Sequence, residues 1–332
     1  MIYKKSIAIC IALILVCAAY IKVSTGAFSS NSTYITWDGL EPDKWASIWL
    51  IKKELSPASS VEVRPMHSRT DDGVAFDIPG AQFYRNAQRS TYASLLQYHE
   101  EQGYKGDAVV QRIGEIIHDI DVNVWADKAL PETAVIENAI RTLQQKYNRL
   151  SVPPECYVEL FDQVYTSLSA GSQVSGEQLN QTIIECDDLG ASHAVTRNTS
   201  VVAEIPVEEL LKQIGLGKNV VFIDTRESEE FNEMHIPGAL NIKLREVNQS
   251  LIPELEDADL IISYCVKDFR GYEVARAIRE LGIEQSAIMV PYGIRGWTDL
   301  GLPVYSHEGL SQQAAMDRLQ YCASALNDCL AP

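Results

Sequence analysis

Leu260–Gly271 (LIISYCVKDFRG) is the stretch that decides the fold of the second half of the chain. Its first five residues are largely β-branched or aromatic, which is typical of a buried strand. The residues from Tyr272 to Leu281 place apolar side chains at helical spacing. Cys265 therefore lies between the end of a strand and the start of a helix, where backbone N–H groups and the helix dipole favour an anion. We expect its thiol to lose its proton readily and to act as a nucleophile.

Arg270 places a fixed positive charge at the far end of the loop, with four residues between it and Cys265. Together the two residues are the predicted catalytic pair. The predicted substrate-binding loop consists of Val266, Lys267, Asp268, Phe269 and Gly271. The alternative is that Cys265 is an ordinary buried thiol, because free cysteine is among the most buried residue types.

Three further motifs accompany this loop. A second buried strand ending in a charged pair, Val220–Arg226 (VVFIDTR), is followed by His235–Ala239 (HIPGA), and Tyr292–Trp297 (YGIRGW) lies downstream. In this order and spacing, the stretch Val201–Tyr305 resembles the rhodanese-like sulfurtransferase family. The resemblance implies an α/β domain with a parallel sheet flanked by helices.

The same resemblance implies a reaction that needs no cofactor. Cys265 would take sulfane sulfur from a small donor such as thiosulfate, hold it as a persulfide, and pass it to a thiol or to cyanide. The four-residue spacing is that of sulfurtransferases, whereas related cysteine phosphatases and arsenate reductases have five, so phosphatase activity is not expected. Asp224 and Arg226 match family positions. This resemblance implies a pair that orients the loop, and the alternative is a salt bridge that only ties the strand to the next helix.

The region from Thr33 to Leu168 forms a separate unit with a different pattern. Tyr34–Trp37 alternates like a strand, and five further segments have apolar residues at helical spacing or begin with proline. These predicted helices are Asp43–Lys53, Thr91–Glu101, Asp107–Asp121 and two that begin at Pro131 and Pro154. The pattern predicts a mainly helical α+β domain.

Short motifs in this unit resemble the chromate resistance exported-protein family: Asp43-Lys44, Phe76-Asp77 and Ile116–Asp121 (IIHDID). The resemblance implies an association with chromate or oxyanion stress. Family members tend to carry a His and a Cys between the Phe83 motif and the next helix, and this chain has neither. It has Arg85 and Arg89 there, which we interpret as an anion-binding surface or, equally, as solvated arginines.

His118 and Asp121 are the weak candidates for a metal site, since imidazole and carboxylate together suit a divalent metal. Asp119 points about a quarter-turn away on the same helix. Capping or pairing near the helix end is the favoured interpretation, and no metal is predicted.

The first residues predict export. Met1–Lys5 is basic, and Ser6–Ile21 is an uncharged, mostly apolar run, as in a secretory signal or signal anchor. We expect a periplasmic or exported protein cleaved near Ala27, or one held in the inner membrane by an uncleaved helix over residues 6–21. The formal net charge of −17 gives no general attraction for nucleic acid.

The predicted organisation has five parts: a signal peptide or anchor (1–27), a chromate resistance exported-protein-like domain (33–168), a linker (169–199), a rhodanese-like domain (200–306) and a C-terminal helical extension (307–332). In an oxidising compartment the remaining cysteines, Cys156, Cys186, Cys322 and Cys329, have the number for two disulfides, with the pairing open. Cys322 and Cys329 would be about 10 Å apart on one helix, so a bond between them requires that the helix breaks.

Two functions follow from the sequence. The first is an exported sulfurtransferase that uses a Cys265 persulfide, with a link to chromate or oxyanion stress. The alternative is a non-catalytic module of chromate resistance that binds or senses an oxyanion or a partner. Retention of both Cys265 and Arg270 favours the enzyme.

Overall fold

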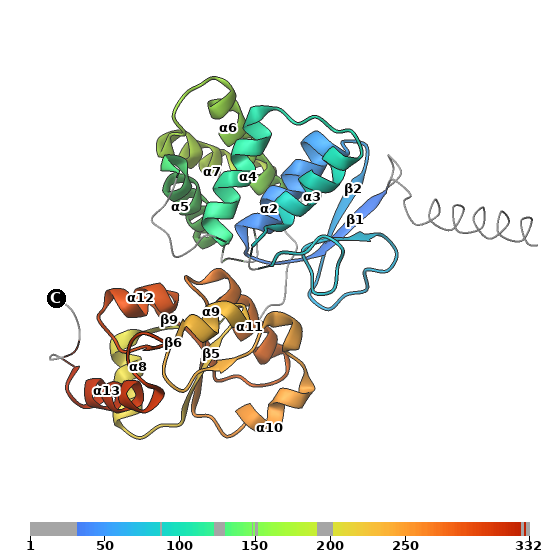
Figure 1. Ribbon diagram of the computed structural model, residues 1–332. Helices are drawn as coiled ribbons and strands as arrows, with labels where there is room; N and C mark the ends of the chain where they lie inside the picture. The colour runs from blue at the N-terminus through green and yellow to red at the C-terminus, as the bar shows by residue number, and fades with distance from the viewer. Residues whose placement is uncertain are drawn as a thin grey trace, which may run out of the picture.

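The computed structural model describes residues 32–86, 88–122, 130–147, 149, 152–190, 202–326 and 329. The predicted signal or anchor, with its cleavage position near Ala27, lies outside these residues. Within the described part of the chain, no helix has the length and apolar character needed to cross a membrane. Figure 1 shows two domains, an N-terminal one rich in helices and a C-terminal one built around a sheet.

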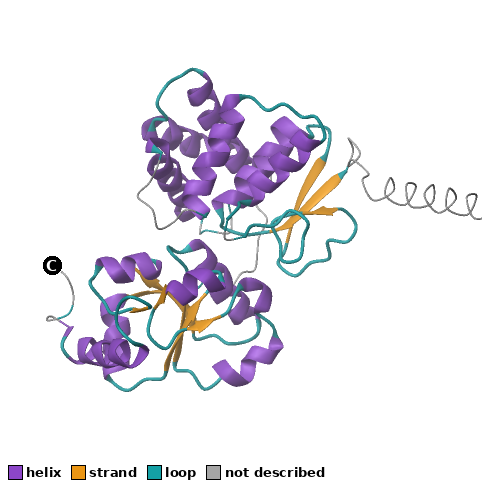
Figure 2. Cartoon of the chain, in the orientation of Figure 1, coloured by secondary structure: helices purple, strands orange, loops and turns teal. Residues whose placement is uncertain are grey.

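The N-terminal domain combines a small sheet with a group of helices (Figure 2). Its three parallel strands have the order β2-β1-β3. They are β1 (Thr33–Trp37), β2 (Ser60–Arg64) and β3 (Val74–Ala75). The helices are α2 (Pro42–Leu50), which continues as a π-helical turn (Ile51–Leu55), α3 (Thr91–Glu101), α4 (Ala108–Asp121), α5 (Pro131–Lys146), α6 (Pro154–Ser169) and α7 (Gly176–Gly190). The predicted mainly helical domain with a few strands is confirmed.

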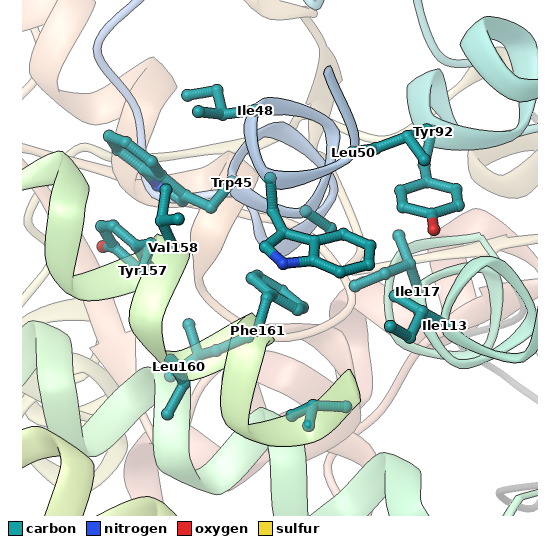
Figure 3. Close-up of a cluster of buried hydrophobic side chains, with 14 of the residues drawn as sticks. Trp45, Ile48, Leu50, Tyr92, Ile113, Ile117, Tyr157, Val158, Leu160 and Phe161 are labelled. Carbon is teal, nitrogen blue, oxygen red and sulfur yellow. The ribbon is translucent and has the colours of Figure 1, made fainter. Parts of the chain in front are cut away.

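The core of this domain is formed around two tryptophans of α2 (Figure 3). Trp45 stacks on Tyr157 of α6 with ring centroids 4.0 Å apart and an angle of 9° between the planes. Trp49 packs near Phe161 and donates its indole N–H to Asp162 at 2.8 Å. Buried aromatic side chains contribute large apolar areas, so α2 and α6 form the centre of the domain.

Helix α7 lies inside the range 169–199 that its small, polar composition assigned to the linker. It packs against α5 and α6, and a disulfide joins Cys156 of α6 to Cys186 of α7. This helix is therefore part of the N-terminal domain. Residues 191–199 of the predicted linker lie outside the described residues.

The C-terminal domain has a five-stranded parallel sheet with the order β4-β9-β8-β5-β7. The strands are β4 (Ala203–Pro206), β5 (Val220–Asp224), β7 (Leu240–Asn241), β8 (Leu260–Tyr264) and β9 (Ser286–Val290). A two-stranded antiparallel pair, β6 (Met234–His235) and β10 (Tyr305–Ser306), lies beside it. The predicted parallel α/β architecture is confirmed.

Helices cover both faces of this sheet. One apolar cluster joins it to α8 (Val207–Gly215), α12 (Gly293–Asp299) and α13 (Gln312–Ser324). A second cluster joins the other face to α10 (Ile252–Leu255) and α11 (Phe269–Glu280), and the remaining helical segments are α9 (Ser228–Glu233) and two 3-10 turns (Leu244–Glu246, Gln249–Leu251). Because α13 ends at Ser324, Cys322 and Cys329 come together and form a disulfide.

Candidate active site

Cys265 lies where the sequence predicts, directly after β8 and before α11. The backbone N–H groups of Gly271 and Lys267 donate to its sulfur. On the other side of the loop, the carbonyls of Cys265 and Val266 accept hydrogen bonds from the N–H groups that open α12, at 2.8 and 3.1 Å. The loop therefore presents N–H groups to the sulfur while its carbonyls are bound elsewhere, an arrangement that stabilises an anionic sulfur.

Two glycines allow this close packing. A Cβ on Gly271 would lie 2.9 Å from the Cα of Tyr264, and one on Gly293 would lie 2.3 Å from the carbonyl oxygen of Val266. Gly293 also has φ +66°, a conformation that side chains disfavour. The cysteine loop is thus held against β8 and α12 by positions that tolerate no side chain.

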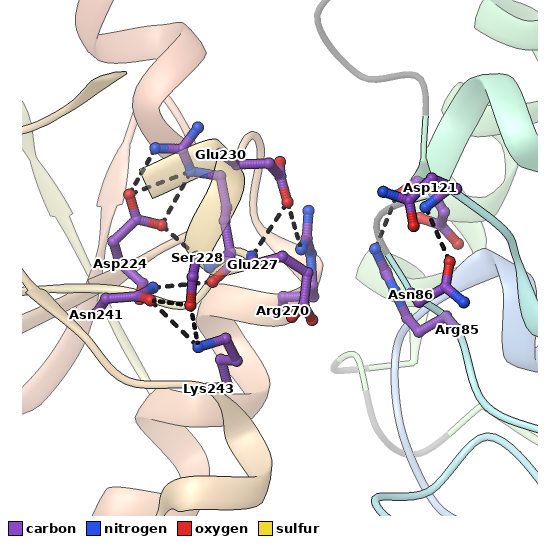
Figure 4. A network of polar contacts seen from close by, with 12 residues as sticks. Arg85, Asn86, Asp121, Asp224, Glu227, Ser228, Glu230, Asn241, Lys243 and Arg270 are labelled. Atoms are coloured by element: carbon purple, nitrogen blue, oxygen red, sulfur yellow. Dashed lines mark hydrogen bonds and ion pairs between the residues drawn. The ribbon is translucent and has the colours of Figure 1, made fainter. Parts of the chain in front are cut away.

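Arg270 lies in the first turn of α11 and lines the same small cavity as Cys265, a space of about 20 Å³. Its guanidinium contacts the carboxylate of Glu230, from α9, at 3.4 Å (Figure 4). Burial alone would raise the pKa of Glu230, but Arg270 and Arg226 hold it below its usual value. The positive charge predicted at the end of the loop is therefore next to the sulfur and only loosely paired.

The thiol itself is not activated in this arrangement. Cys265 is only 4 % exposed, and burial raises the pKa of its thiol, although Arg270 and the loop N–H groups act in the opposite direction. The sequence-based expectation of an easily ionised thiol is therefore wrong for the closed structure. Desolvation disfavours the thiolate more than the neighbouring donors favour it.

The N-terminal domain packs against the loop that carries Cys265. Lys267 forms an ion pair with Glu137 of α5. Asp268 pairs with Arg141 of the same helix and with Arg149, the latter at 2.9 Å. We call these contacts the loop clasp. Both charged residues predicted to contact a substrate are thus engaged by the other domain.

Aromatic and apolar contacts extend the interface around the loop clasp. The Arg141 guanidinium lies 4.4 Å from the ring centroid of Phe269, and the Arg149 guanidinium lies 5.1 Å from that of Tyr272. Leu40 of the N-terminal domain packs into an apolar cluster of the C-terminal domain that includes both aromatic residues. Its backbone N–H donates to Glu273 of α11 at 2.9 Å. The two domains are therefore joined by charged, aromatic and apolar contacts together.

The end of α4 covers the cysteine directly. Ile120 and Asp121 line the cavity of Cys265 and Arg270. His118, one turn earlier, instead lines a separate cavity between α3 and α4. The two weak metal candidates thus face different spaces. Nowhere among the described residues do three or more His, Cys, Asp or Glu side chains form a group that would hold a metal ion.

Asp224 and Arg226 form a buried pair at the end of β5. The Arg226 side chain donates twice to the carboxylate, at 2.9 and 2.6 Å, and also to the backbone carbonyl of Met234 at 2.6 Å. Neither residue lines the cavity at Cys265. The geometry favours the structural interpretation of the pair, but the contact ties the strand end to Met234 of β6 and not to the next helix.

The predicted anion-binding arginines have different environments. Arg85 is buried, donates to the backbone carbonyl of Asp121 at 2.9 Å, and lines a cavity between the domains together with Arg270. Arg89, just before α3, is exposed and donates to the side chain of Gln97 on that helix at 2.5 Å. The structure therefore brings one of the two arginines to the candidate site.

Sequence reasoning missed the residues that close the site, chiefly Glu137, Arg141, Arg149 and Glu230. Glu137 and Arg141 are spaced as an ordinary i,i+4 surface pair on a helix, so nothing local indicates a partner more than a hundred residues away. Asp268, too, has the pattern of a solvated residue in a substrate-binding loop, so it gives no signal of the contact.

Comparisons with known proteins agree with this architecture. Residues 34–168 match the family described as "ChrB, C-terminal domain", and residues 206–300 match the "Rhodanese-like domain". The chain thus joins a ChrB C-terminal domain to a rhodanese-like domain, which confirms the predicted fusion.

Similar proteins include "Putative sulfur carrier protein YrkF" of Bacillus subtilis, 30% identical over 39% of this chain and 65% of the relative. The chain therefore spans slightly less than two thirds of that protein. "Thiosulfate:glutathione sulfurtransferase" of Saccharomyces cerevisiae is 25% identical over 32% of this chain and 85% of the relative. Among solved structures, the BH2092 protein of Bacillus halodurans is 25% identical, with a TM-score of 0.28 over 31% of this chain and 77% of that one. At the level of the family, the rhodanese-like domain and the relatives from Bacillus subtilis and Saccharomyces cerevisiae support a role in sulfur transfer.

Proposed function

We propose that the protein is an exported sulfurtransferase that moves sulfane sulfur through a persulfide on Cys265. The observation that most directly supports this proposal is the arrangement around this thiol. Two loop N–H groups donate to its sulfur, and Arg270 lines the same cavity. Among the described residues it is also the one cysteine outside a disulfide.

With a donor such as thiosulfate, the first half of the reaction transfers one sulfur atom to Cys265. The Cys265 thiolate attacks the outer sulfur of the donor, a new S–S bond forms, the old one breaks, and sulfite leaves with the bonding electron pair. In the second half, an acceptor thiolate attacks the outer sulfur of the persulfide, and the Cys265 thiolate leaves. Each step needs an anion stabilised on sulfur, which the loop N–H groups and the guanidinium of Arg270 favour.

Turnover requires that the N-terminal domain moves away from the loop. The space beside the sulfur is about 20 Å³, little more than one ordered water needs. Ile120 and Asp121 at the end of α4 line that space, and the loop clasp holds the N-terminal domain against the loop. We therefore propose a closed resting state and an open reactive state, with the ChrB C-terminal domain as the cover.

Export is supported by the basic and apolar N-terminal sequence and by two disulfides, which persist mainly in oxidising compartments. Cell fractionation with a C-terminal tag tests this part. Recovery in the periplasm with residues 1–27 removed is the expected result, and recovery in the membrane fraction with an intact N-terminus would instead indicate an anchor.

The central experiment is a sulfur-transfer assay with thiosulfate on the purified full chain, beside Cys265→Ser. We expect sulfite release, a mass increase of one sulfur atom on the parent, and neither on the variant. Product formation by Cys265→Ser, or none by the parent under conditions that expose the thiol, would contradict the proposal.

A non-catalytic binding or sensing module is the second candidate, favoured by the burial of Cys265 under the other domain. In that case the loop would respond to a partner or an oxyanion without transferring sulfur. A parent protein whose thiol is alkylated after opening, but which never acquires sulfur from thiosulfate, would establish this alternative.

A further inference from the structure

A second cavity lies between the two domains beside Arg270. Its volume is about 40 Å³, roughly three times what one ordered water needs. The N-terminal domain contributes Lys44 and Arg85 to its lining, and the C-terminal domain contributes Thr225 and Arg270. Because Arg270 also lines the cavity of Cys265, the two spaces share one guanidinium.

Besides one carboxylate oxygen each of Glu41 and Glu273, two donor groups in this cavity lack the partners that buried polar groups ordinarily have. The hydroxyl of Thr225 is buried, and no hydrogen bond to it is found within the described part of the chain. Arg85 is 8 % exposed and donates to a backbone carbonyl, and among the described residues no carboxylate lies within ion-pair distance of it. Buried polar and charged groups are costly unless they are satisfied, so both point to a bound ligand.

The carboxylates in the lining do not neutralise these donors, because each has another cation. Asp77 pairs with Lys44 at 3.0 Å, Glu227 with Arg245 at 3.2 Å, and Glu41 lies 4.0 Å from Lys44. Asp38 and Glu273 both pair with Arg276, at 3.3 and 2.9 Å. Lys243, another cation of the lining, donates to Ser228, Asn241 and Glu246. The cations left for a ligand are Arg85 and Arg270, whose contact with Glu230 is longer than a strong charge-assisted hydrogen bond.

Two acidic groups behind Arg85 attract it electrostatically, namely Asp121 and Asp43. The carboxylate of Asp121 accepts the backbone N–H of Asp43, and that of Asp43 accepts two N–H groups at the start of α3. Burial raises the pKa of both carboxyls, and Arg85 acts in the opposite direction on that of Asp121. Arg85 itself stays protonated beside the cavity.

We propose that this cavity is a binding site for a small sulfur oxyanion, held by the guanidinium groups of Arg85 and Arg270 and by the hydroxyl of Thr225. The choice of a sulfur oxyanion rests on the proposed function, because the bound group lies next to the residue that serves Cys265. In this arrangement the ChrB C-terminal domain contributes directly to recognition of the sulfur donor or of the oxyanion released from it.

The test measures sulfate binding by calorimetry on the full chain, at an ionic strength held constant with chloride. Sulfate is the probe because it has the oxyanion chemistry and no transferable sulfur. We expect Arg85→Gln to weaken binding about tenfold or more, and Thr225→Val a few-fold, because each removes a donor to a charged ligand. Arg89→Gln, the exposed arginine four residues on, is the matched control and should bind like the parent.

Arg85→Lys provides a second variant should Arg85→Gln fail to fold, and it should bind sulfate with intermediate affinity because it keeps the charge without the planar fork. Equal sulfate affinity in the parent, Arg85→Lys and Thr225→Val, or no sulfate binding by the parent, would overturn the site.

The same variants distinguish a failure of this binding site from a failure of the proposed sulfur transfer. Cys265→Ser should still bind sulfate and should bind thiosulfate without turnover. If binding depends on Arg85 while the parent never acquires sulfur, the site stands and the sulfurtransferase proposal fails. If sulfur transfer proceeds while Arg85→Gln leaves both sulfate binding and the KM for thiosulfate unchanged, the reaction stands and the site is overturned.

Discussion

The Cys265 loop and the surface that covers it are built in opposite ways. The loop is one contiguous stretch between β8 and α11, held by backbone hydrogen bonds from α12 and by glycines. Its cover is assembled from the end of α4, from α5 and from Arg149, positions far from the loop in sequence. The donors that face the sulfur are thus local to the loop, whereas the surface packed over it comes from the other domain.

The largest effect that tests this division is the loss of the nucleophile. Cys265→Ser should abolish sulfur transfer completely and leave the two domains folded and closed, because the side chain contributes to the loop and not to the loop clasp. Activity and the melting temperature measure the two halves of this expectation. A variant that lost its interface together with its activity would show that loop and cover are not independent.

Removal of the positive charge should have the next largest effect. Arg270→Ala should slow sulfur transfer on the order of a hundredfold, since one electrostatic donor to a developing anion commonly contributes that much. Arg318→Ala on α13, which is exposed, is the control and should turn over like the parent. An unchanged kcat for Arg270→Ala would leave Arg270 with a structural role only.

Breaking the loop clasp should increase the exposure of the Cys265 thiol. In Arg141→Gln/Arg149→Gln, the buried carboxylate of Asp268 loses both cations, which strongly disfavours the closed state. We expect alkylation of Cys265 by iodoacetamide to become about tenfold faster or more. Arg112→Gln removes ion pairs inside the N-terminal domain only and should not change the rate. Identical rates in all three proteins would mean that the interface does not limit access.

The smallest effect is a shift along the pH axis. Burial raises the pKa of the Cys265 thiol, so protonation of this thiol stabilises the closed state relative to the open state. This stabilisation is fully present below the ordinary thiol pKa and is lost as the pH rises through the raised pKa of the closed state. Alkylation of the parent should therefore accelerate at a higher pH than it does for a free cysteine. The inflection should move to lower pH in Arg141→Gln/Arg149→Gln, where Arg270 and the loop N–H groups act on an exposed thiol. Coincident pH profiles would show that burial does not control ionisation.

Much of the fold follows from local patterns. The predicted helix Thr91–Glu101 coincides with α3, and the one ending at Asp121 coincides with α4 to within a residue at its start. Periodicity and proline positions suffice here because each helix buries one continuous face. The strand, loop and helix around Cys265 are predictable for the same reason.

The remaining features depend on contacts between distant parts of the chain. Helix α7 has a polar composition, and its place in the domain depends on packing against two other helices and on a disulfide to Cys156. Asp268 looks like a solvated loop residue, yet it is 1 % exposed between two arginines of another domain. No local period encodes such a contact, so the closed state of the site was not predictable.

The loop clasp has a consequence for any measured rate. If only a fraction of the molecules is open at a given moment, the observed turnover is the intrinsic rate multiplied by that fraction. Each additional 1.4 kcal/mol or so in favour of the closed state lowers the observed rate about tenfold without altering a single atom of the reactive loop. A partner that binds only the open form would raise turnover by the same arithmetic, so a low basal rate would measure the closed population rather than the competence of Cys265.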